Sequence, residues 1–151
     1  MKRSIKTFII SATIAVGLLG TYSCIDDVDL VTEDAKEGGL VTPAATSISF
    51  VGNPVSVSVE TTEGITEVNF YKSYNKGGVA SNEVLDKTIT VTDGHVSFTS
   101  DYASLKSGIT GMPALFTDLE VGDYWTFRIV STLADGREVQ SATPVEIVVD
   151  N

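Results

Sequence analysis

The feature that most constrains the fold is a period-two alternation of apolar and polar residues, which recurs through the chain after about residue 40. In the stretch PVSVSVETT every second residue from Val55 to Val59 is valine. Successive side chains of a β-strand point to opposite faces of a sheet, so this pattern predicts a half-buried strand. The same alternation recurs in EVNFYKSY, LDKTITV, HVSFTS, DYWTFRIVSTL, REVQSA and PVEIVVD. The pattern therefore predicts an all-β domain.

The turn signals between these stretches predict how the strands connect. Asp93-Gly94 and Asp135-Gly136 each stand between two alternating stretches, where an Asp-Gly pair is typical of a β-hairpin. The stretch YNKGGVAS is predicted to be a loop, and SDYASLKSG gives the only helical signal, a short turn with Ser100 or Asp101 as its cap. About seven short strands without a long crossover helix predict a single antiparallel β-sandwich over residues 40–151.

The N-terminus predicts export. A basic segment, MKRSIK, precedes the uncharged stretch TFIISATIAVGLLG. Its apolar run is about a dozen residues long, whereas a transmembrane helix needs about twenty. Residues 1–23 are therefore predicted to be a secretory signal peptide rather than a membrane span.

The only cysteine of the chain, Cys24, follows this segment directly. The stretch LLGTYSCIDDVD resembles the signal of bacterial lipoproteins, and the resemblance implies that lipid is attached to Cys24 and the preceding peptide removed. Asp26, Asp27 and Asp29 resemble the acidic export signal of surface lipoproteins of the Bacteroidota, which implies display outside the outer membrane. The alternative is an ordinary cleaved signal with an incidental cysteine. A secreted thiol without a disulfide partner is a redox liability, which favours acylation.

Residues 24–39 are predicted to form a flexible tether. The stretch IDDVDLVTEDAKEGG is highly charged, poor in large apolar residues and closed by two glycines. Removal of the signal peptide takes away three cations and changes the formal charge from −10 to −13. Binding to nucleic acid rests on Lys and Arg that neutralise phosphates, so a nucleic-acid partner is not expected.

One stretch, LEVGDYWTFRIVS, resembles the corner and penultimate strand of fibronectin type III and related immunoglobulin-like modules. Leu119, Gly122 and Trp125 occupy the places of the leucine, the turn glycine and the aromatic residue of that corner. The resemblance implies an immunoglobulin-like sandwich in which Trp125, Phe127 and Ile129 point into the core. These modules usually have tyrosine at the place of Trp125, and an indole N–H can also donate a hydrogen bond when buried.

No catalytic residue, metal ligand or cofactor site is predicted. The single histidine, His95, follows an Asp-Gly turn and is expected to be exposed. A catalytic histidine would need a positioned nucleophile and a third group that orients it. One histidine and one lipidated cysteine leave only carboxylates as metal ligands. A pair of carboxylates of the glycosidase kind stays open, so an enzyme is the third and least favoured class.

Four tyrosines are the candidate ligand-binding residues, because they fall on predicted outward registers or in loops: Tyr71, Tyr74, Tyr102 and Tyr124. Together they could stack on sugar rings, and the alternative is that they are ordinary strand surface. We therefore expect a lipid-anchored protein of the outer membrane whose sandwich is a non-catalytic binding or accessory module. Its partner would be a glycan or an outer-membrane protein. The alternative function is a structural or assembly subunit of a surface complex.

Overall fold

The structure is a computed structural model that describes residues 39–151. The predicted lipid attachment at Cys24 and the acidic cluster of Asp26, Asp27 and Asp29 lie outside these residues. The strands are β1 (Val41–Pro43), β2 (Ser47–Phe50), β3 (Val55–Thr61), β4 (Ile65–Lys76), β5 (Val79–Ala80), β6 (Val84–Thr90), β7 (His95–Ser100), β8 (Tyr124–Leu133), β9 (Glu138–Gln140) and β10 (Val145–Val149). A short helix, α1 (Tyr102–Lys106), and a 3₁₀ turn, η2 (Phe116–Asp118), lie between β7 and β8.

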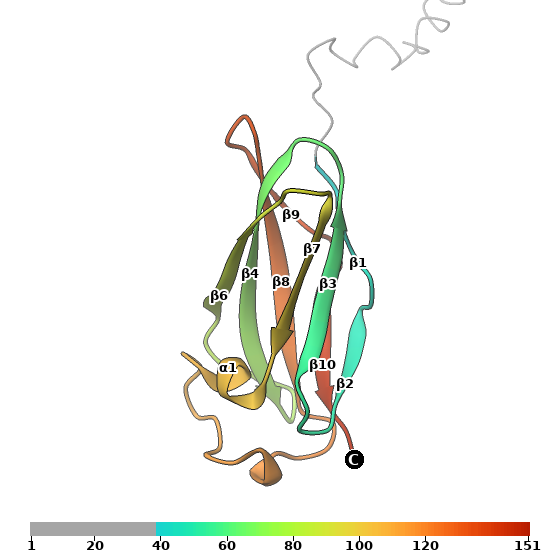
Figure 1. The fold of residues 1–151 in the computed structure, drawn as a ribbon. Helices are drawn as coiled ribbons and strands as arrows, with labels where there is room; N and C mark the ends of the chain where they lie inside the picture. Colours follow the sequence, from blue (N-terminus) through green and yellow to red (C-terminus); the bar gives the residue numbers. More distant parts are fainter. Residues whose placement is uncertain (1–38) are drawn as a thin grey trace, which may run out of the picture. The chain divides into compact units, whose positions relative to one another are not determined.

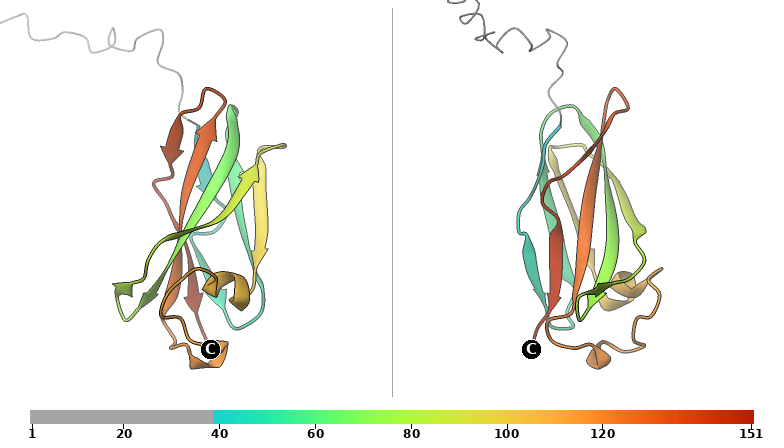
Figure 2. Two further views of the ribbon diagram at one scale, coloured as in Figure 1. Left: turned by 90° about the vertical axis from the view of Figure 1, so that its left-hand side faces the viewer. Right: turned by 180° about the vertical axis from the view of Figure 1, so that it is seen from behind.

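The strands form two facing sheets, so the predicted all-β sandwich is confirmed (Figure 1). One sheet has the order β1-β3-β7, and the other has the order β2-β10-β8-β4, continued at its edge by β5 and β6. Figure 2 shows from behind that β4, β8 and β10 lie together in one layer. In an immunoglobulin-like sandwich with strands A to G, strands B and E pair in one sheet, and strands C, F and G lie together in the other. Here β3 and β7 take the places of B and E, and β4, β8 and β10 take the places of C, F and G.

One pairing is parallel, in contrast to the wholly antiparallel sandwich that the sequence predicts. β2 runs parallel to β10, with Ile48 opposite Ile147. The chain reaches this position because the N-terminal stretch divides between the sheets, with β1 on β3 and β2 on β10. The division follows Pro43, which has no N–H to continue the first ladder.

The alternating stretches bury the residues that the period-two pattern assigns to the core. Val55, Val57 and Val59 of β3 are all buried, and the residues between them face outward. The predicted helical turn is also confirmed, because the Asp101 carboxylate caps α1 by accepting a hydrogen bond from the Ser104 N–H at 2.8 Å. Local pattern therefore accounts for most of the elements.

The predicted hairpin at Asp93-Gly94 is wrong, whereas the one at Asp135-Gly136 is confirmed. β8 and β9 pair on either side of Asp135-Gly136. β6 pairs instead with β4, and β7 pairs with β3 in the opposite sheet, so Asp93-Gly94 connects the two layers. An Asp-Gly pair marks a turn with positive φ but does not determine which neighbours the flanking strands take. The stretch predicted as a loop contains a further small hairpin, β4–β5, with Gly77 and Gly78 at φ 55° and 85°.

Trp125 lies in the core, as predicted, with none of its surface exposed. Its indole ring packs against the rings of Phe50, Tyr74 and Tyr102, at centroid distances of 5.5, 5.2 and 6.3 Å. The Trp125 Nε1 atom is buried and has no hydrogen-bond partner among residues 39–151. The indole therefore contributes packing to this corner and leaves its donor unused.

Replacement of Trp125 by alanine is expected to lower the free energy of unfolding by about 3–5 kcal/mol, the range for large aromatic side chains in cores. Urea unfolding of the full-length protein measures the effect. The matched control is Tyr124→Ala, which removes a half-buried ring from the outward register next to it. A Trp125→Ala protein that unfolds at the wild-type midpoint would contradict the core assignment.

Candidate functional site

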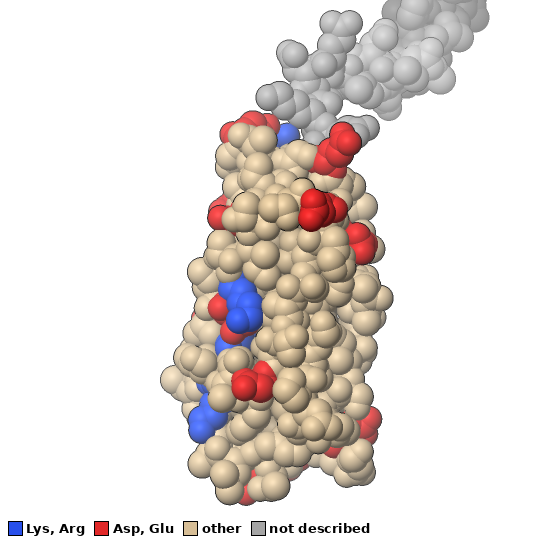
Figure 3. Space-filling view, viewed as in Figure 1, with Lys and Arg blue, Asp and Glu red and all other residues tan. Residues whose placement is uncertain are grey.

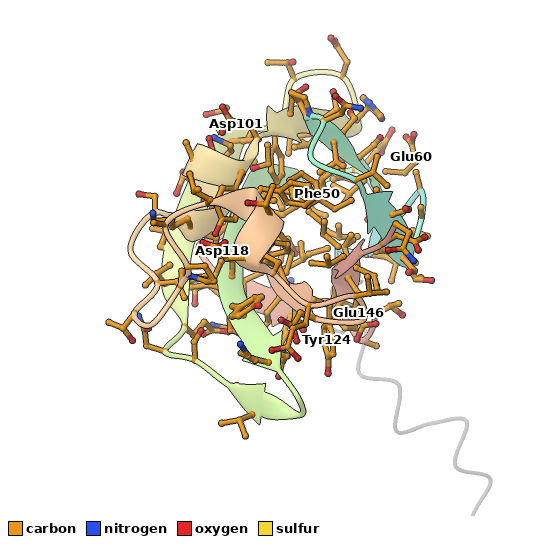
Figure 4. All side chains as sticks on the ribbon, turned by 90° about the horizontal axis from the view of Figure 1, so that it is seen from below. Phe50, Glu60, Asp101, Asp118, Tyr124 and Glu146 are labelled. Atoms are coloured by element: carbon orange, nitrogen blue, oxygen red, sulfur yellow. The ribbon has the colours of Figure 1, made fainter. Side chains whose placement is uncertain are left out.

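One end of the sandwich, which we call the loop pole, carries most of the irregular structure. It consists of residues 51–54, residues 101–123 with α1 and η2, and residues 149–151, and it lies at the lower end of Figure 1. The described domain begins with Gly39 at the opposite end. Figure 4 looks onto the loop pole, with Phe50 near its middle and Asp101 and Asp118 on one side.

Two cavities are lined by loop-pole residues alone. The larger, of about 520 Å³, lies beside α1 and is lined by Tyr102, Ala103, Lys106, Ser107, Gly108, Ile109 and Ala114. The smaller, of about 260 Å³, is lined by Val51, Phe116, Thr117, Leu119, Val121, Val149, Asp150 and Asn151. Volumes of about 300–1,000 Å³ are typical of sites for small ligands, so the larger cavity is of a size to hold one.

Several large apolar side chains are exposed around these cavities. Val51, Leu115 and Val121 are each about half exposed or more. Phe116 is held beneath them by edge-to-face contacts with Phe50 at 5.2 Å and Tyr102 at 6.2 Å. The loop pole therefore presents apolar surface on a rigid aromatic support, which is the composition of a contact surface rather than of a solvated loop.

A buried lysine fixes α1 against the sheet. Lys72 lies on the inward register of β4, and its Nζ contacts Asp86 Oδ1 at 2.5 Å and the Ser104 carbonyl of α1. Because the Lys72 side chain is almost fully buried, hydrogen bonds to these two acceptors offset the loss of its hydration. Lys72 thus ties β6 and α1 to the central strand, and it positions the helix that carries Tyr102 and Lys106.

A second buried polar contact fixes the turn before β8. The Tyr74 hydroxyl donates to Asp123 Oδ2 at 2.5 Å, and the same carboxylate accepts from the Glu120 N–H at 3.4 Å. Gly122, at φ 93°, makes the turn between them and donates its N–H to the Val149 carbonyl at 2.9 Å. Tyr74 therefore fixes the turn that directly precedes Trp125 through a side-chain hydrogen bond from β4.

The structure separates the four candidate tyrosines. Tyr74 is buried, so its predicted loop position is wrong: β4 runs to Lys76, and Tyr74 shares the inward face with Phe70. Tyr102 is half-buried on α1, where it lines the larger cavity and donates its hydroxyl to the Pro113 carbonyl at 2.9 Å. Tyr74 therefore belongs to the interior and Tyr102 to the loop pole, so the two do not share one outward surface.

Tyr71 and Tyr124 share the outer face of the larger sheet but not one patch. In the register of β4 and β8, Tyr71 lies opposite Arg128 and Tyr124 opposite Asn75. The four-residue offset corresponds to about 13 Å along the strands. The Arg128 guanidinium also covers the Tyr71 ring at 4.3 Å from its centroid. The four tyrosines therefore do not form the continuous stacking surface that the sequence left open.

The Arg128 guanidinium also makes two parallel hydrogen bonds to a carboxylate. Its Nε and Nη2 lie 2.9 and 2.7 Å from the two carboxylate oxygens of Glu83. These bonds lower the pKa of Glu83 and raise that of Arg128. The pair is half exposed, so it orders this sheet surface more than it stabilises the fold.

On the outer face of the smaller sheet, His95 lies between a serine and a glutamate. Its Nδ1 is 2.9 Å from Glu60 Oε1, and its Nε2 is 3.4 Å from Ser58 Oγ. This is the order of groups in a serine hydrolase triad, and the sequence did not predict it. The His95 and Glu60 side chains are 45% and 65% exposed on a sheet face. Catalytic electrostatic stabilisation depends on a site that excludes water, so the arrangement fits a solvated polar cluster.

Charge is distributed unevenly over the domain. On the face shown in Figure 3, basic side chains gather on the side of β6 and α1, whereas acidic side chains are spread from end to end. Within residues 39–151, no cluster of three His, Cys, Asp or Glu side chains is placed to hold a metal ion. No helix in the same part of the chain is long and apolar enough to span a membrane.

Comparison with known proteins gives no family for this chain. No protein family model matches the sequence, and no curated protein matches it. Solved structures do match, among them that of murine CRIg, with 12% identity and a TM-score of 0.42. The match covers 76% of this chain and 100% of the CRIg chain.

The Tyr74–Asp123 contact predicts a loss of stability at high pH. Burial, and then the hydrogen bond to Asp123, raise the pKa of Tyr74 above its ordinary value of 10.0. The folded state holds this proton more tightly than the unfolded chain does. The resulting stability is therefore fully present below about pH 10 and is lost as the pH rises above it.

Tyr74→Phe is expected to cost about 1.5–3 kcal/mol at neutral pH, because it removes a hydrogen bond to a carboxylate. Between about pH 8 and about pH 11, the variant should lose less unfolding free energy than the wild type, since the phenol no longer titrates. Urea unfolding of both full-length proteins at the two pH values measures the difference. Equal losses would contradict the assignment.

Proposed function

We propose that this protein is a lipid-anchored cell-surface protein whose sandwich is a non-catalytic binding or accessory module that uses the loop pole. The anchor is lipid on Cys24 in the outer membrane, and Asp26, Asp27 and Asp29 direct display on the cell surface. The support for this part is the sequence pattern of residues 1–29, in which a basic segment, an apolar run, the cysteine and the aspartates follow in order.

The loop pole is the single observation that carries the binding function. It combines the two cavities with exposed apolar side chains, and it lies at the end of the domain opposite to Gly39. A domain tethered through residue 39 leaves this end open to a ligand. Functional sites on β-sandwiches commonly lie on the loops at one end, where a rigid scaffold positions them.

A glycan is the ligand class that the larger cavity fits best. The Tyr102 ring supplies an aromatic wall, and Lys106 and Ser107 supply polar groups beside it. Sugars combine apolar C–H faces with hydroxyl groups, so they need both kinds of surface. The buried contacts of Lys72 and the aromatic cluster hold this wall in place before any ligand arrives.

The exposed apolar residues of the loop pole favour a second candidate, an assembly subunit of a surface complex. Val51 and Val121 line the smaller cavity, and Leu115 directly precedes Phe116 of its lining; a protein partner would bury these side chains. Exposed apolar side chains that gather at one place on a surface mark protein contacts in soluble domains. The glycan proposal uses the larger cavity, so the two functions can be separated by mutation.

Cys24→Ser is expected to abolish lipid attachment and release the protein from the membrane fraction, because this thiol is the only one in the chain. Metabolic labelling with a fatty-acid analogue, followed by fractionation, measures both effects. Cys24→Ser protein that still carries the label would show that the anchor is wrongly placed.

Glycan binding is tested by affinity electrophoresis of the full-length protein in gels that contain xylan, β-glucan or galactomannan. At least one polysaccharide should retard the wild type, and Ala103→Glu should weaken that retardation about tenfold, or about 1.4 kcal/mol. Ala103 is exposed and lines the larger cavity, so the added carboxylate obstructs it. The matched control is Ala134→Glu, an exposed position in the β8–β9 turn.

Retardation that both glutamate variants retain would exclude the larger cavity as the site. If no polysaccharide retards the wild type, the glycan proposal is wrong and assembly becomes the leading function. Assembly predicts a discrete cross-linked adduct on intact cells that Val121→Asp removes and Ala103→Glu retains.

A further inference from the structure

The Lys72–Asp86 pair is the most deeply buried charged contact among residues 39–151. Lys72 lies between Phe70 and Tyr74 on the inward face of β4, and all three are buried. The side chains of Lys72 and Asp86 are 1% and 6% exposed, and Nζ lies 2.5 Å from Asp86 Oδ1. Two charges out of water are costly unless their remaining donors and acceptors are also satisfied.

A β-bulge brings Asp86 to this position. Phe70 pairs with Lys87 and Tyr71 pairs with Leu85, so Asp86 is the extra residue of β6. Bulges redirect one side chain relative to the regular alternation. The irregularity in β6 is therefore what turns the Asp86 carboxylate toward Lys72.

The surroundings of the pair within residues 39–151 leave one oxygen of the carboxylate without a hydrogen-bond partner. They also hold the Lys72 nitrogen and the Asp86 carboxyl group in a position to condense with each other. Asp86 Oδ2 is buried and has no hydrogen-bond partner among the described residues. The second contact of Nζ is the Ser104 carbonyl, which accepts a hydrogen from the nitrogen and orients it. A neutral amide would remove both buried charges and one of the two carboxylate oxygens, and keep the other as its carbonyl.

We propose that Lys72 and Asp86 form an intramolecular isopeptide bond, a modification independent of the proposed binding function. The ammonium of Lys72 first transfers one proton to the Asp86 carboxylate, which gives an amine and a neutral carboxyl group. The amine nitrogen then attacks Cγ of Asp86 and forms the C–N bond. The nitrogen passes a second proton to the carboxyl hydroxyl, the C–O bond breaks, and water leaves. Nothing is oxidised or reduced, and no co-reactant is needed.

Proximity in a dry site drives this reaction. The two groups are held in contact by β4 and β6, so the step is unimolecular and its orientation is set in advance. The bond closes a loop between residues 14 positions apart and ties the edge strand β6 covalently to β4. A covalent cross-link of this kind restricts the unfolded chain, which suits a protein exposed to proteases outside the cell.

Tryptic mapping of the full-length protein by tandem mass spectrometry tests the proposal. Trypsin cleaves after Lys36, Lys72, Lys76 and Lys87 in an unmodified chain. An isopeptide bond at Lys72 blocks cleavage there, so residues 37–76 should appear as one peptide joined to residues 77–87. The mass of the branched peptide should be that of its two parts less one water. Lys76, which pairs with Glu120 on the surface, is the internal control and should be cleaved normally.

Lys72→Arg and Asp86→Leu should each lose the branched peptide. Recovery of residues 37–72 and 77–87 from the wild type only as separate peptides of unmodified mass would overturn the proposal. So would a branched peptide that persists in Asp86→Leu. The wild-type result decides the question even if a variant does not fold.

Discussion

A lysine on the inward face of the central strand is the constraint on which the rest of the domain depends. Lys72 occupies a position that the alternation of β4 assigns to the core, between Phe70 and Tyr74. Its Nζ reaches Asp86 from β6 and the Ser104 carbonyl from α1. The bulge in β6 and the placement of α1 are both explained by this single buried group, because each element brings an oxygen to it.

The loop pole is built outward from that contact. α1 is too short to be stable alone, and its position is set by Lys72, by the Asp101 cap and by the packing of Tyr102 on Trp125. On the other side of the pole, Asp123 holds the turn before β8 through Tyr74. With its support buried in this way, the pole can expose apolar side chains and cavities without loss of shape, which is the condition for a binding surface that is formed in advance.

The sequence predicts those parts of the fold that local pattern controls. Seven of the ten strands within residues 39–151, the burial of Trp125 and the Asp101 cap follow from alternation, from the corner motif and from helix-cap chemistry, whereas β1, β2 and β5 were not predicted. Tyr74 was misassigned because a tyrosine close to a glycine pair reads as a loop residue, although its parity with Phe70 already places it inward. The strand after Asp93-Gly94, β7, was predicted to pair with β6 but pairs with β3, because no local signal in the sequence shows which sheet a strand joins.

The polar interior could not be predicted from the sequence. Val84 and Ile89 of β6 both pack against the core. Counting every second residue forward from Val84 places Asp86 inward, whereas counting back from Ile89 places Lys87 inward. Both are correct because of the bulge, which is visible only in the pairing with β4. The cavity beside α1 likewise depends on residues from the helix and from the loop after it, whose separation in space the sequence does not give.

The central claim, that Lys72 holds α1 and with it the loop pole, is tested most directly by amide hydrogen exchange on the full-length protein. Lys72→Met is compared with Lys87→Met, which removes a cation from the same side of the sandwich, where Lys87 Nζ lies 5.5 Å from the Phe98 ring. In Lys72→Met, the Leu105 and Ser107 amides, which bond the Asp101 and Ala103 carbonyls, should exchange much faster relative to the β8 amides than they do in Lys87→Met. Unchanged protection of these two amides relative to β8 would contradict the account.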